Sequence, residues 1–300
     1  MRRGILVLLL GLLGLIVLQP AQDLFAQDPQ EQPLRLVAHE WGVWMVENGR
    51  VTIDDLAAES PQFVFRTPAA PERPIPTIVR PNVTVRKPVL YMRASRPIDD
   101  LRVEVQFRGG RPWLYYPDAE VAGNRLRFRG RLAPNGTARD ARVPPRQRHW
   151  WAFLQAVPAD TFESAAGGSE RFIFYDGPVR FRPPVMLRGD TVRARRGERR
   201  VWVVANGEYV ESVATPRELR EALRGPMDAL SDRLEDVLRR EGLTLEETAS
   251  LLQTWEPELT DGDRHVIYLL TRAEYDQMLP ITITPRPTEL VRVGMVIAPF

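Results

Sequence analysis

Short runs of alternating apolar and polar residues recur along most of the chain. Each run is typical of a β-strand with one buried face, because successive side chains of a strand point to opposite sides. Short strands at this spacing predict an antiparallel β-sandwich-like core. The expected strands cover 62–66, 85–92, 101–107, 112–116, 125–132, 150–157, 171–175, 191–195, 200–205, 266–270 and 290–296.

The first strong turn signal is Asn48-Gly49, which separates Trp44-Met45-Val46 from Val51-Thr52-Ile53. This dipeptide predicts a two-residue hairpin turn between two strands. Continuing the alternation backwards places Glu40 on the apolar face of the first strand and His39 on the opposite face. A buried Glu40 must be paired, hydrogen-bonded or protonated, and we expect pairing with an arginine.

Two helix-start signals lie towards the C-terminus. Thr215–Glu218 has the pattern of a capping box with proline at the first helical position, and Thr244–Glu247 has a second such pattern. Apolar residues at three- and four-residue spacing follow each box, which predicts a helical hairpin over 215–256, kinked at Gly225-Pro226. Strand patterns resume afterwards. The fold class is therefore α+β, mainly β, with the hairpin inserted into one β-rich domain.

The N-terminal segment has the pattern of a secretory signal. Arg2 and Arg3 precede an apolar run from 4 to 18, which is short for a membrane-spanning helix, and a polar stretch follows. We expect a signal peptide at 1–26, a polar linker at 27–33 and a single domain at 34–300. The protein would be exported to the periplasm, the cell surface or the medium, with membrane contact only through an uncleaved signal.

Composition narrows the possible chemistry. The chain has no cysteine, which excludes a disulfide framework and a thiol nucleophile. Its 44% hydrophobic content is ordinary for a globular protein. Lys87 is the single lysine among 41 basic residues, so arginine supplies nearly all the positive charge. The net charge of +2 conceals a basic region at 101–150 and an acidic region at 216–263.

The clearest basic feature is a row of arginines within an alternating stretch. An extended chain places Arg125, Arg127 and Arg129 on one face, with Leu126 and Phe128 on the other. Such a row could hold a polyanion such as an acidic polysaccharide, or it could pair with acidic residues of the protein itself. Nucleic acid is not an expected partner, because an exported chain without an aromatic-basic motif lacks the usual signature.

Metal and hydrolase motifs are incomplete in this sequence. Val43 stands four residues after His39, so the zinc-protease pattern His-Glu-x-x-His is absent, and His149 and His265 lie far away in the chain. The segment 167–170 lacks the second glycine of a serine-hydrolase elbow. The sequence therefore predicts no metal site and no cofactor.

Several short segments spread over most of the chain form a recognisable set. They are His39–Gly42, Lys87–Tyr91, Leu114–Pro117, Trp150-Trp151, Phe172–Gly177, Thr254-Trp255, Leu279-Pro280 and Arg292-Val293. The set resembles a group of uncharacterised exported bacterial proteins that open with a His-Glu-Trp-Gly segment, usually followed by Thr-Phe where this chain has Val43-Trp44. No activity is established for the group, so the resemblance implies no catalytic residue. It implies a single unit that extends to the C-terminus.

The first of two expected function classes is an exported noncatalytic binding or structural protein of the periplasm or cell envelope. Its partner would be an envelope glycan, an acidic polymer or a protein. Aromatic faces stack on sugar rings and guanidinium groups hold acidic substituents. The expected ligand-binding residues are Trp113, Tyr115, Tyr116, Arg125, Arg127 and Arg129.

The alternative class is a hydrolase, either glycosidase-like or metal-assisted. Its candidate catalytic residues are His39, Glu40, His149 and Asp176, since carboxylates and histidines are the usual acid–base groups. Glycoside hydrolysis would require two carboxyl groups roughly 5 to 9.5 Å apart across a cleft. The relative positions of Glu40 and Asp176 therefore test this class.

Overall fold

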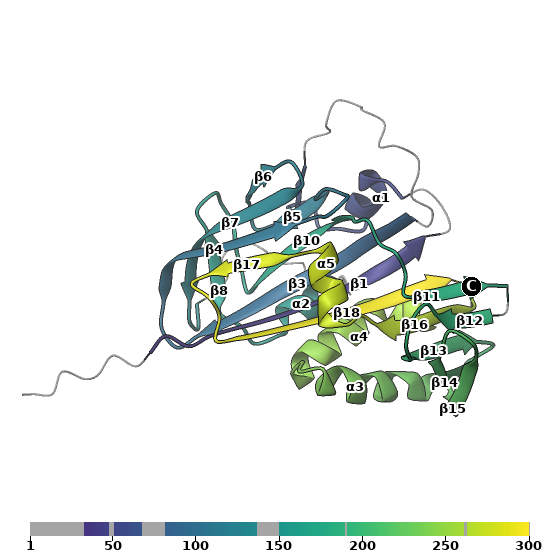
Figure 1. Cartoon of the computed structure of the whole chain (residues 1–300). Helices are drawn as coiled ribbons and strands as arrows, with labels where there is room; N and C mark the ends of the chain where they lie inside the picture. The colour runs from purple at the N-terminus through teal and green to yellow at the C-terminus, as the bar shows by residue number, and fades with distance from the viewer. Residues whose placement is uncertain are drawn as a thin grey trace, which may run out of the picture. The chain divides into compact units, whose positions relative to one another are not determined.

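Extended backbone dominates the part of the chain that the structure describes (Figure 1). The computed structural model describes residues 33–47, 51–67, 82–136, 150–189, 191–260 and 263–299. Strands make up about 48% of the structure and helices about 21%, which confirms the α+β, mainly β, class. Residues from Leu34 onward form one compact unit.

A ten-stranded sheet runs through the middle of this unit. Its neighbouring strands are antiparallel except for β1 and β18, which pair in parallel from Val37–Glu289 to Met45–Ile297. In spatial order the sheet contains β15 (Leu219–Pro226), β14 (Glu208–Ala214), β13 (Arg199–Ala205), β16 (His265–Leu269), β18 (Glu289–Pro299), β1 (Leu36–Glu47), β3 (Asn82–Ala94), β10 (Phe172–Pro178), β5 (Leu114–Tyr116) and β2 (Phe65–Arg66).

A six-stranded sheet packs against one face of the large sheet. It contains β17 (Ile281–Thr284), β4 (Ile98–Gln106), β7 (Arg125–Ala133), β8 (Thr161–Ser164) and β9 (Ser169–Glu170), with β6 (Glu120–Ala122) beside β7. The core between the sheets joins Trp44 and Leu90 of the large sheet to Val103 and Phe128 of the smaller one. A separate hairpin of β11 (Val185–Arg188) and β12 (Thr191–Ala194) contributes to the same core. The arrangement is sandwich-like, as expected.

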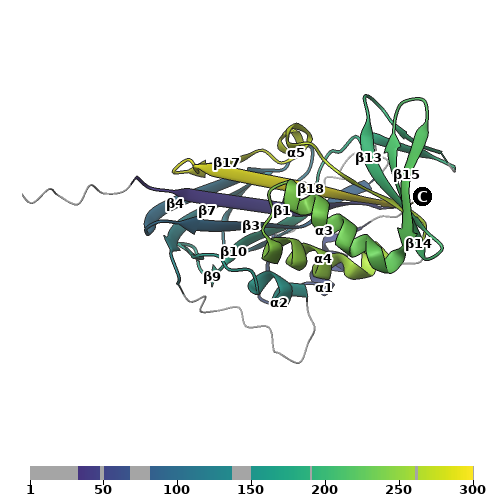
Figure 2. The same ribbon diagram turned by 90° about the horizontal axis from the view of Figure 1, so that it is seen from below.

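Helices cover the opposite face of the large sheet (Figure 2). They are α1 (Ile53–Ala58), α2 (Trp150–Gln155), α3 (Leu230–Arg240), preceded by the 3₁₀ turn η1 (Met227–Ala229), and α4 (Leu245–Thr260). A second hydrophobic core lies between these helices and the large sheet. It includes Trp41 and Phe174 from the sheet and Leu234 and Trp255 from the helices. The remaining helix, α5 (Arg272–Met278), adds Tyr275 to the core of the sandwich.

The predicted helical hairpin is present, and its second capping box is confirmed. The backbone N–H of Glu247 donates to Thr244 Oγ1 at 3.2 Å, and the Thr244 N–H donates to Glu247 Oε2 at 3.0 Å. This reciprocal pair satisfies two of the free donors at the start of α4. The α3–α4 hairpin then returns the chain to the large sheet at β16.

The predicted start of this hairpin at 215 is wrong. Thr215 Oγ1 accepts hydrogen bonds from the N–H groups of Arg217 and Glu218, but the turn leads into strand β15 and not into a helix. The four-residue spacing of Leu219 and Leu223 fits a helix, but β15 pairs with β14 and has a register shift between the two leucines. Both leucines are exposed on this edge strand.

The predicted pairing of strand 44–46 with 51–53 is also wrong, although the Asn48-Gly49 tip itself lies outside the described residues. β1 pairs with β3 and β18 instead, and Ile53 begins helix α1. Thr52 caps this helix by accepting a hydrogen bond from the Asp55 N–H at 3.3 Å. A local capping signal therefore outweighed the β-branched character of the segment.

Residues 150–157, predicted as a strand, form α2 and the turn after it. Trp151, Leu154 and Val157 are buried, and their three-residue spacing is close to one helical turn. Of the two adjacent tryptophans, Trp151 lies in the core beneath the helices and Trp150 is partly buried at its margin.

Candidate functional site

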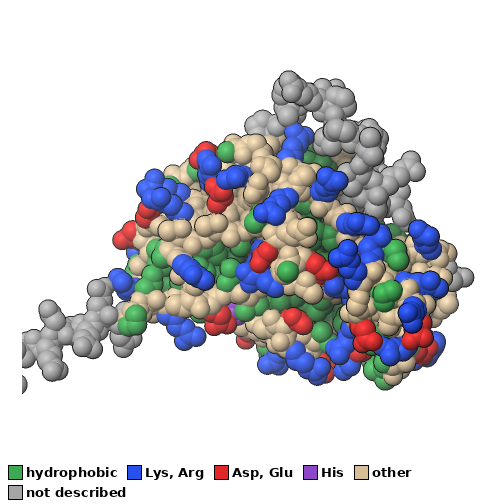
Figure 3. Space-filling model, viewed as in Figure 1, with side chains coloured by type: hydrophobic (Ala, Val, Ile, Leu, Met, Phe, Trp, Pro, Cys, Tyr) green, Lys and Arg blue, Asp and Glu red, His purple; other side chains and the backbone are tan. Residues whose placement is uncertain are grey.

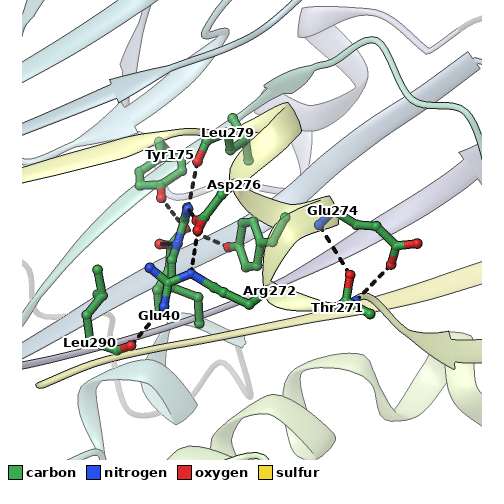
Figure 4. A network of polar contacts seen from close by, with 10 residues as sticks. Glu40, Tyr175, Thr271, Arg272, Glu274, Asp276, Leu279 and Leu290 are labelled. Carbon is green, nitrogen blue, oxygen red and sulfur yellow. Dashed lines mark hydrogen bonds and ion pairs between the residues drawn. The ribbon is translucent and has the colours of Figure 1, made fainter.

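Glu40 is fully buried and lies at the centre of a polar network (Figure 4). Arg292 of β18 donates to it twice, from Nε to Oε2 at 2.6 Å and from Nη2 to Oε1 at 3.0 Å. The hydroxyl of Tyr275 donates to Oε1 at 2.6 Å, and the hydroxyl of Tyr175 donates to the same oxygen. The expected buried pairing of Glu40 with an arginine is confirmed.

The arginine of this network is itself fully engaged. Arg292 Nη1 also donates to the Leu279 carbonyl at 2.8 Å and pairs with Asp276, and the guanidinium lies 4.0 Å from the Tyr275 ring centroid. Burial alone would lower the pKa of Arg292, but the charge of Glu40 raises it well above the usual range. The network thus links β1, β10, β18 and α5 through buried hydrogen bonds and an ion pair.

His39 points to the helical side of the sheet, opposite to Glu40, as the alternation predicted. Its Nδ1 lies 2.8 Å from Glu247 Oε2 in α4, and its Nε2 lies 3.5 Å from the carboxylate of Glu289. Arg93 donates to the other Glu247 oxygen at 2.9 Å. Burial raises the pKa of Glu247, but hydrogen bonds from His39 and the Thr244 backbone outweigh it, and the net pKa is lowered.

Asp176 belongs to a different cluster, built where two strand pairings are irregular. The register of β1 with β3 shifts between Trp41 and Val43, and that of β10 with β3 shifts between Phe174 and Gly177. Between these points Lys87 adopts φ +52°, a left-handed conformation that is uncommon for a residue with a side chain. Irregularities of this kind change the face of the sheet to which the following side chains point.

The result is a buried charged cluster on the helical face. Val85 faces the core between the sheets, yet the next two residues, Arg86 and Lys87, both reach Trp255 of α4. The Lys87 backbone N–H donates to Asp176 Oδ2 at 3.5 Å. Burial raises the pKa of Asp176 to about 7, against the opposing effect of the two nearby cations.

The candidate hydrolase residues are therefore not brought together. Tyr175 donates to Glu40, while the next residue, Asp176, lies near Arg86 and Lys87 on the other side of the sheet. The two carboxyl groups do not face each other across a cleft. His149 lies outside the described residues.

The remaining histidine also has a structural environment. His265 Nδ1 lies 2.8 Å from the carbonyl oxygen of Asp263, and the side chain is buried at the start of β16. Within the described ranges, no group of three or more His, Cys, Asp or Glu side chains is arranged to hold a metal ion.

The three aromatic residues that were expected to bind a ligand are not on the surface. Trp113, Tyr115 and Tyr116 retain 8%, 6% and 3% of their exposure. Tyr115 packs into the core between the sheets, and the other two pack under the helices. Their burial leaves no open aromatic face on which a sugar ring could stack, so these residues act as core in this structure.

The arginine row has the predicted alternation, with Leu126 and Phe128 buried on the opposite face. Its guanidinium groups are paired with the protein's own acids across β4 and β6, which was one of the two open interpretations. The pairs are Arg125–Glu104 at 2.8 Å, Arg127–Glu104 at 2.9 Å, Arg127–Glu120 at 3.1 Å, Arg129–Asp100 at 2.7 Å and Arg131–Asp99 at 3.1 Å.

A second basic site was not predicted from the sequence, and it lines a cavity of the folded chain. A cavity of about 520 Å³ lies by the β11–β12 hairpin, the start of β13 and α5, within the size range of small-ligand sites. Figure 3 shows basic side chains gathered over this part of the molecule. The lining residues are Arg182, Pro184, Met186, Arg195, Arg196, Arg199 and Glu274.

The charge of this pocket is only partly balanced. Arg199 pairs with Glu274 at 2.7 Å and also donates to the Leu269 carbonyl, while Arg195 Nε donates to the Pro183 carbonyl at 2.7 Å. Four arginines thus face one carboxylate. The run Arg193 to Arg200 was a visible signal in the sequence, but Arg182 joins it only in the folded chain.

No protein-family model, curated protein or solved structure matches this chain. None of the described helices is long and apolar enough to cross a membrane.

Proposed function

We propose that this chain is an exported noncatalytic binding protein of the periplasm or cell envelope, and that its ligand is a glycan or other polymer carrying acidic groups. The observation that carries the proposal is the pocket lined by four arginines and a single carboxylate. Planar guanidinium groups bind carboxylate, sulfate and phosphate through paired hydrogen bonds.

The pocket is a better site than the arginine row on β7. In the row, every arginine already pairs with an acidic side chain, so a polyanion would have to displace those partners. In the pocket, Arg182 and Arg196 make no hydrogen bond or ion pair with another described residue. Their charges remain available to a ligand.

The noncatalytic interpretation is supported by the environments of the candidate catalytic groups. Glu40 accepts hydrogen bonds on both oxygens from buried partners, and His39 is held by Glu247. Export is supported by the basic N-terminus and the apolar run that follows it.

The test compares binding of dextran sulfate and neutral dextran to the purified chain. We expect dextran sulfate to bind with an affinity that falls as salt rises, because charge pairing drives the interaction. The double variant R195Q/R196Q should lose at least about tenfold in affinity, corresponding to about 1.4 kcal/mol. Neutral dextran should not bind.

The matched control is R127Q/R129Q, which removes two arginines from the paired row on β7. Its affinity for dextran sulfate should equal that of the wild type. If the two double variants weaken binding equally, or if the wild type does not retain dextran sulfate, the pocket is not the binding site.

A further inference from the structure

The single lysine of the chain occupies an unusual place for a lysine. Lys87 retains 6% of its exposure, and its Nζ lies 4.3 Å from the ring centroid of Trp255 and 5.1 Å from that of Trp150. Lysine is among the residues least often fully buried, and the surrounding strands adopt bulges and a positive φ to place it there. The fold therefore directs this amine to one specific position.

The surroundings of Lys87 contain two features that activate a lysine as a nucleophile, namely burial and an adjacent cation. The indole rings bury the amine and Arg86 supplies the cation, whereas the carboxylates of Glu59, Asp176 and Glu258 favour the ammonium form. The tryptophan faces attract the ammonium form, but burial and the charge of Arg86 disfavour it, and the pKa of Lys87 is lowered.

The half-exposed side chain of Glu59 lies beside the amine of Lys87. The Glu59 side chain is 49% exposed, and its Oε2 lies 3.9 Å from Lys87 Nζ. The same oxygen accepts a hydrogen bond from Arg86 Nη2. A small molecule that reaches Glu59 from solvent is thus within a few ångströms of Nζ.

We propose that Lys87 is a nucleophilic amine that forms a Schiff base with small aldehydes or ketones. The neutral amine of Lys87 attacks the carbonyl carbon, and the carbonyl oxygen becomes the hydroxyl of a carbinolamine. Glu59, whose Oε2 lies 3.9 Å from Nζ, accepts the proton that Nζ loses through one intervening water and returns it to the departing hydroxyl. One water leaves, a C=N bond replaces the C=O bond, and no oxidant or reductant is consumed.

This activity does not depend on the anion-binding proposal, because no residue of the arginine pocket belongs to the Lys87 cluster. The variant R195Q/R196Q should therefore keep the full reactivity of Lys87. Failure of one proposal leaves the other intact.

The test uses the fact that the chain has only one lysine. The folded protein is incubated with acetaldehyde and cyanoborohydride, which fixes any Schiff base as a stable ethyl group, and peptide mass mapping separates Lys87 from the terminal amine. The reference is K87R/R193K, in which the single lysine stands at an exposed position on β12. Each fall of one in a lysine pKa raises the neutral fraction near pH 7 about tenfold.

We expect Lys87 to be ethylated at pH 7 at least about tenfold faster than the lysine of the K87R/R193K variant. Its rate should also level off at a lower pH, and unfolding in urea should remove the advantage. If folded Lys87 reacts no faster than the reference, or if its rate follows the same pH profile, Lys87 is a buried structural cation and the proposal is overturned.

Discussion

Replacing Arg292 by methionine leaves the carboxylate of Glu40 buried without its cation. In the wild type, the guanidinium makes two hydrogen bonds to Glu40, a further one to the Leu279 carbonyl, and a close contact with the Tyr275 ring. Both partners of the pair have side chains with no solvent exposure. Removing one member of such a buried pair typically costs about 3 to 5 kcal/mol. We expect R292M to lose that much free energy of unfolding.

A second substitution separates the charge effect from the loss of packing. In E40Q/R292M, no unpaired charge remains, and the amide oxygen at position 40 can still accept from the hydroxyls of Tyr175 and Tyr275. Since a buried pair can often be replaced by neutral groups at little cost, the double variant should be more stable than the sum of the single losses predicts, by at least about 1 kcal/mol.

The assay is urea unfolding followed by tryptophan fluorescence, with free energies taken from linear extrapolation. The matched control is R127M, which breaks the exposed ion pairs of Arg127 with Glu104 and Glu120 and should cost at most about 1 kcal/mol. If R292M costs no more than R127M, or if the losses at positions 40 and 292 are additive, the buried network does not have the energetics assigned to it.

Three further outcomes are expected. Burial raises the pKa of Asp176 to about 7, so the folded state keeps a proton that the unfolded chain releases near pH 4. The free energy of unfolding should therefore fall as the pH rises from about 4 to about 7, by at most about 1.4 kcal/mol per pH unit. D176N should remove this part of the pH dependence in urea titrations, and an unchanged slope would contradict the assignment. T244A should lower the free energy of unfolding by about 1 kcal/mol, because the N-terminal cap of α4 is lost. T215A changes an exposed turn before a strand and should lower it by under about 0.5 kcal/mol, and thermal unfolding measures both losses. G294A should cost about 1 to 3 kcal/mol, because its Cβ would lie 2.7 Å from the Trp44 ring, and a melting temperature equal to that of the wild type would show that the ring can move aside.

The two-residue period of β-strands made the faces of β1 and β7 predictable from the sequence. Glu40 and His39 lie on opposite sides of the large sheet, and Leu126 and Phe128 are buried beneath exposed arginines, as alternation requires. The face on which each of these side chains lies follows from its position in the strand alone, so the local sequence was sufficient to predict it.

The alternation of side chains does not predict which residues pair over long distances in the chain. Arg292 is 252 residues from Glu40, and no spacing rule singles it out among the other arginines of the chain. The same limit applied to Thr215, since four-residue spacing is compatible with a helix and with one face of a strand. Only pairing with β14, which is a tertiary contact, decided the outcome.

The basic pocket illustrates why binding sites are harder to predict than strands. Arg195 and Arg196 follow β12 and Arg182 precedes β11, so their convergence depends on how a separate two-stranded hairpin packs beside β13 and α5. Lys87 was conspicuous as the single lysine, but its orientation depends on two register shifts that the sequence does not reveal.

The parallel pairing of β1 with β18 has a consequence for the order in which the large sheet forms. Both strands lie in the interior of this sheet, and β1 has β3 as its other neighbour. Contacts of such high sequence separation slow folding, because a long loop must close before they form. We therefore expect the two parts of the large sheet on either side of the β1–β18 seam to join in a late step of folding.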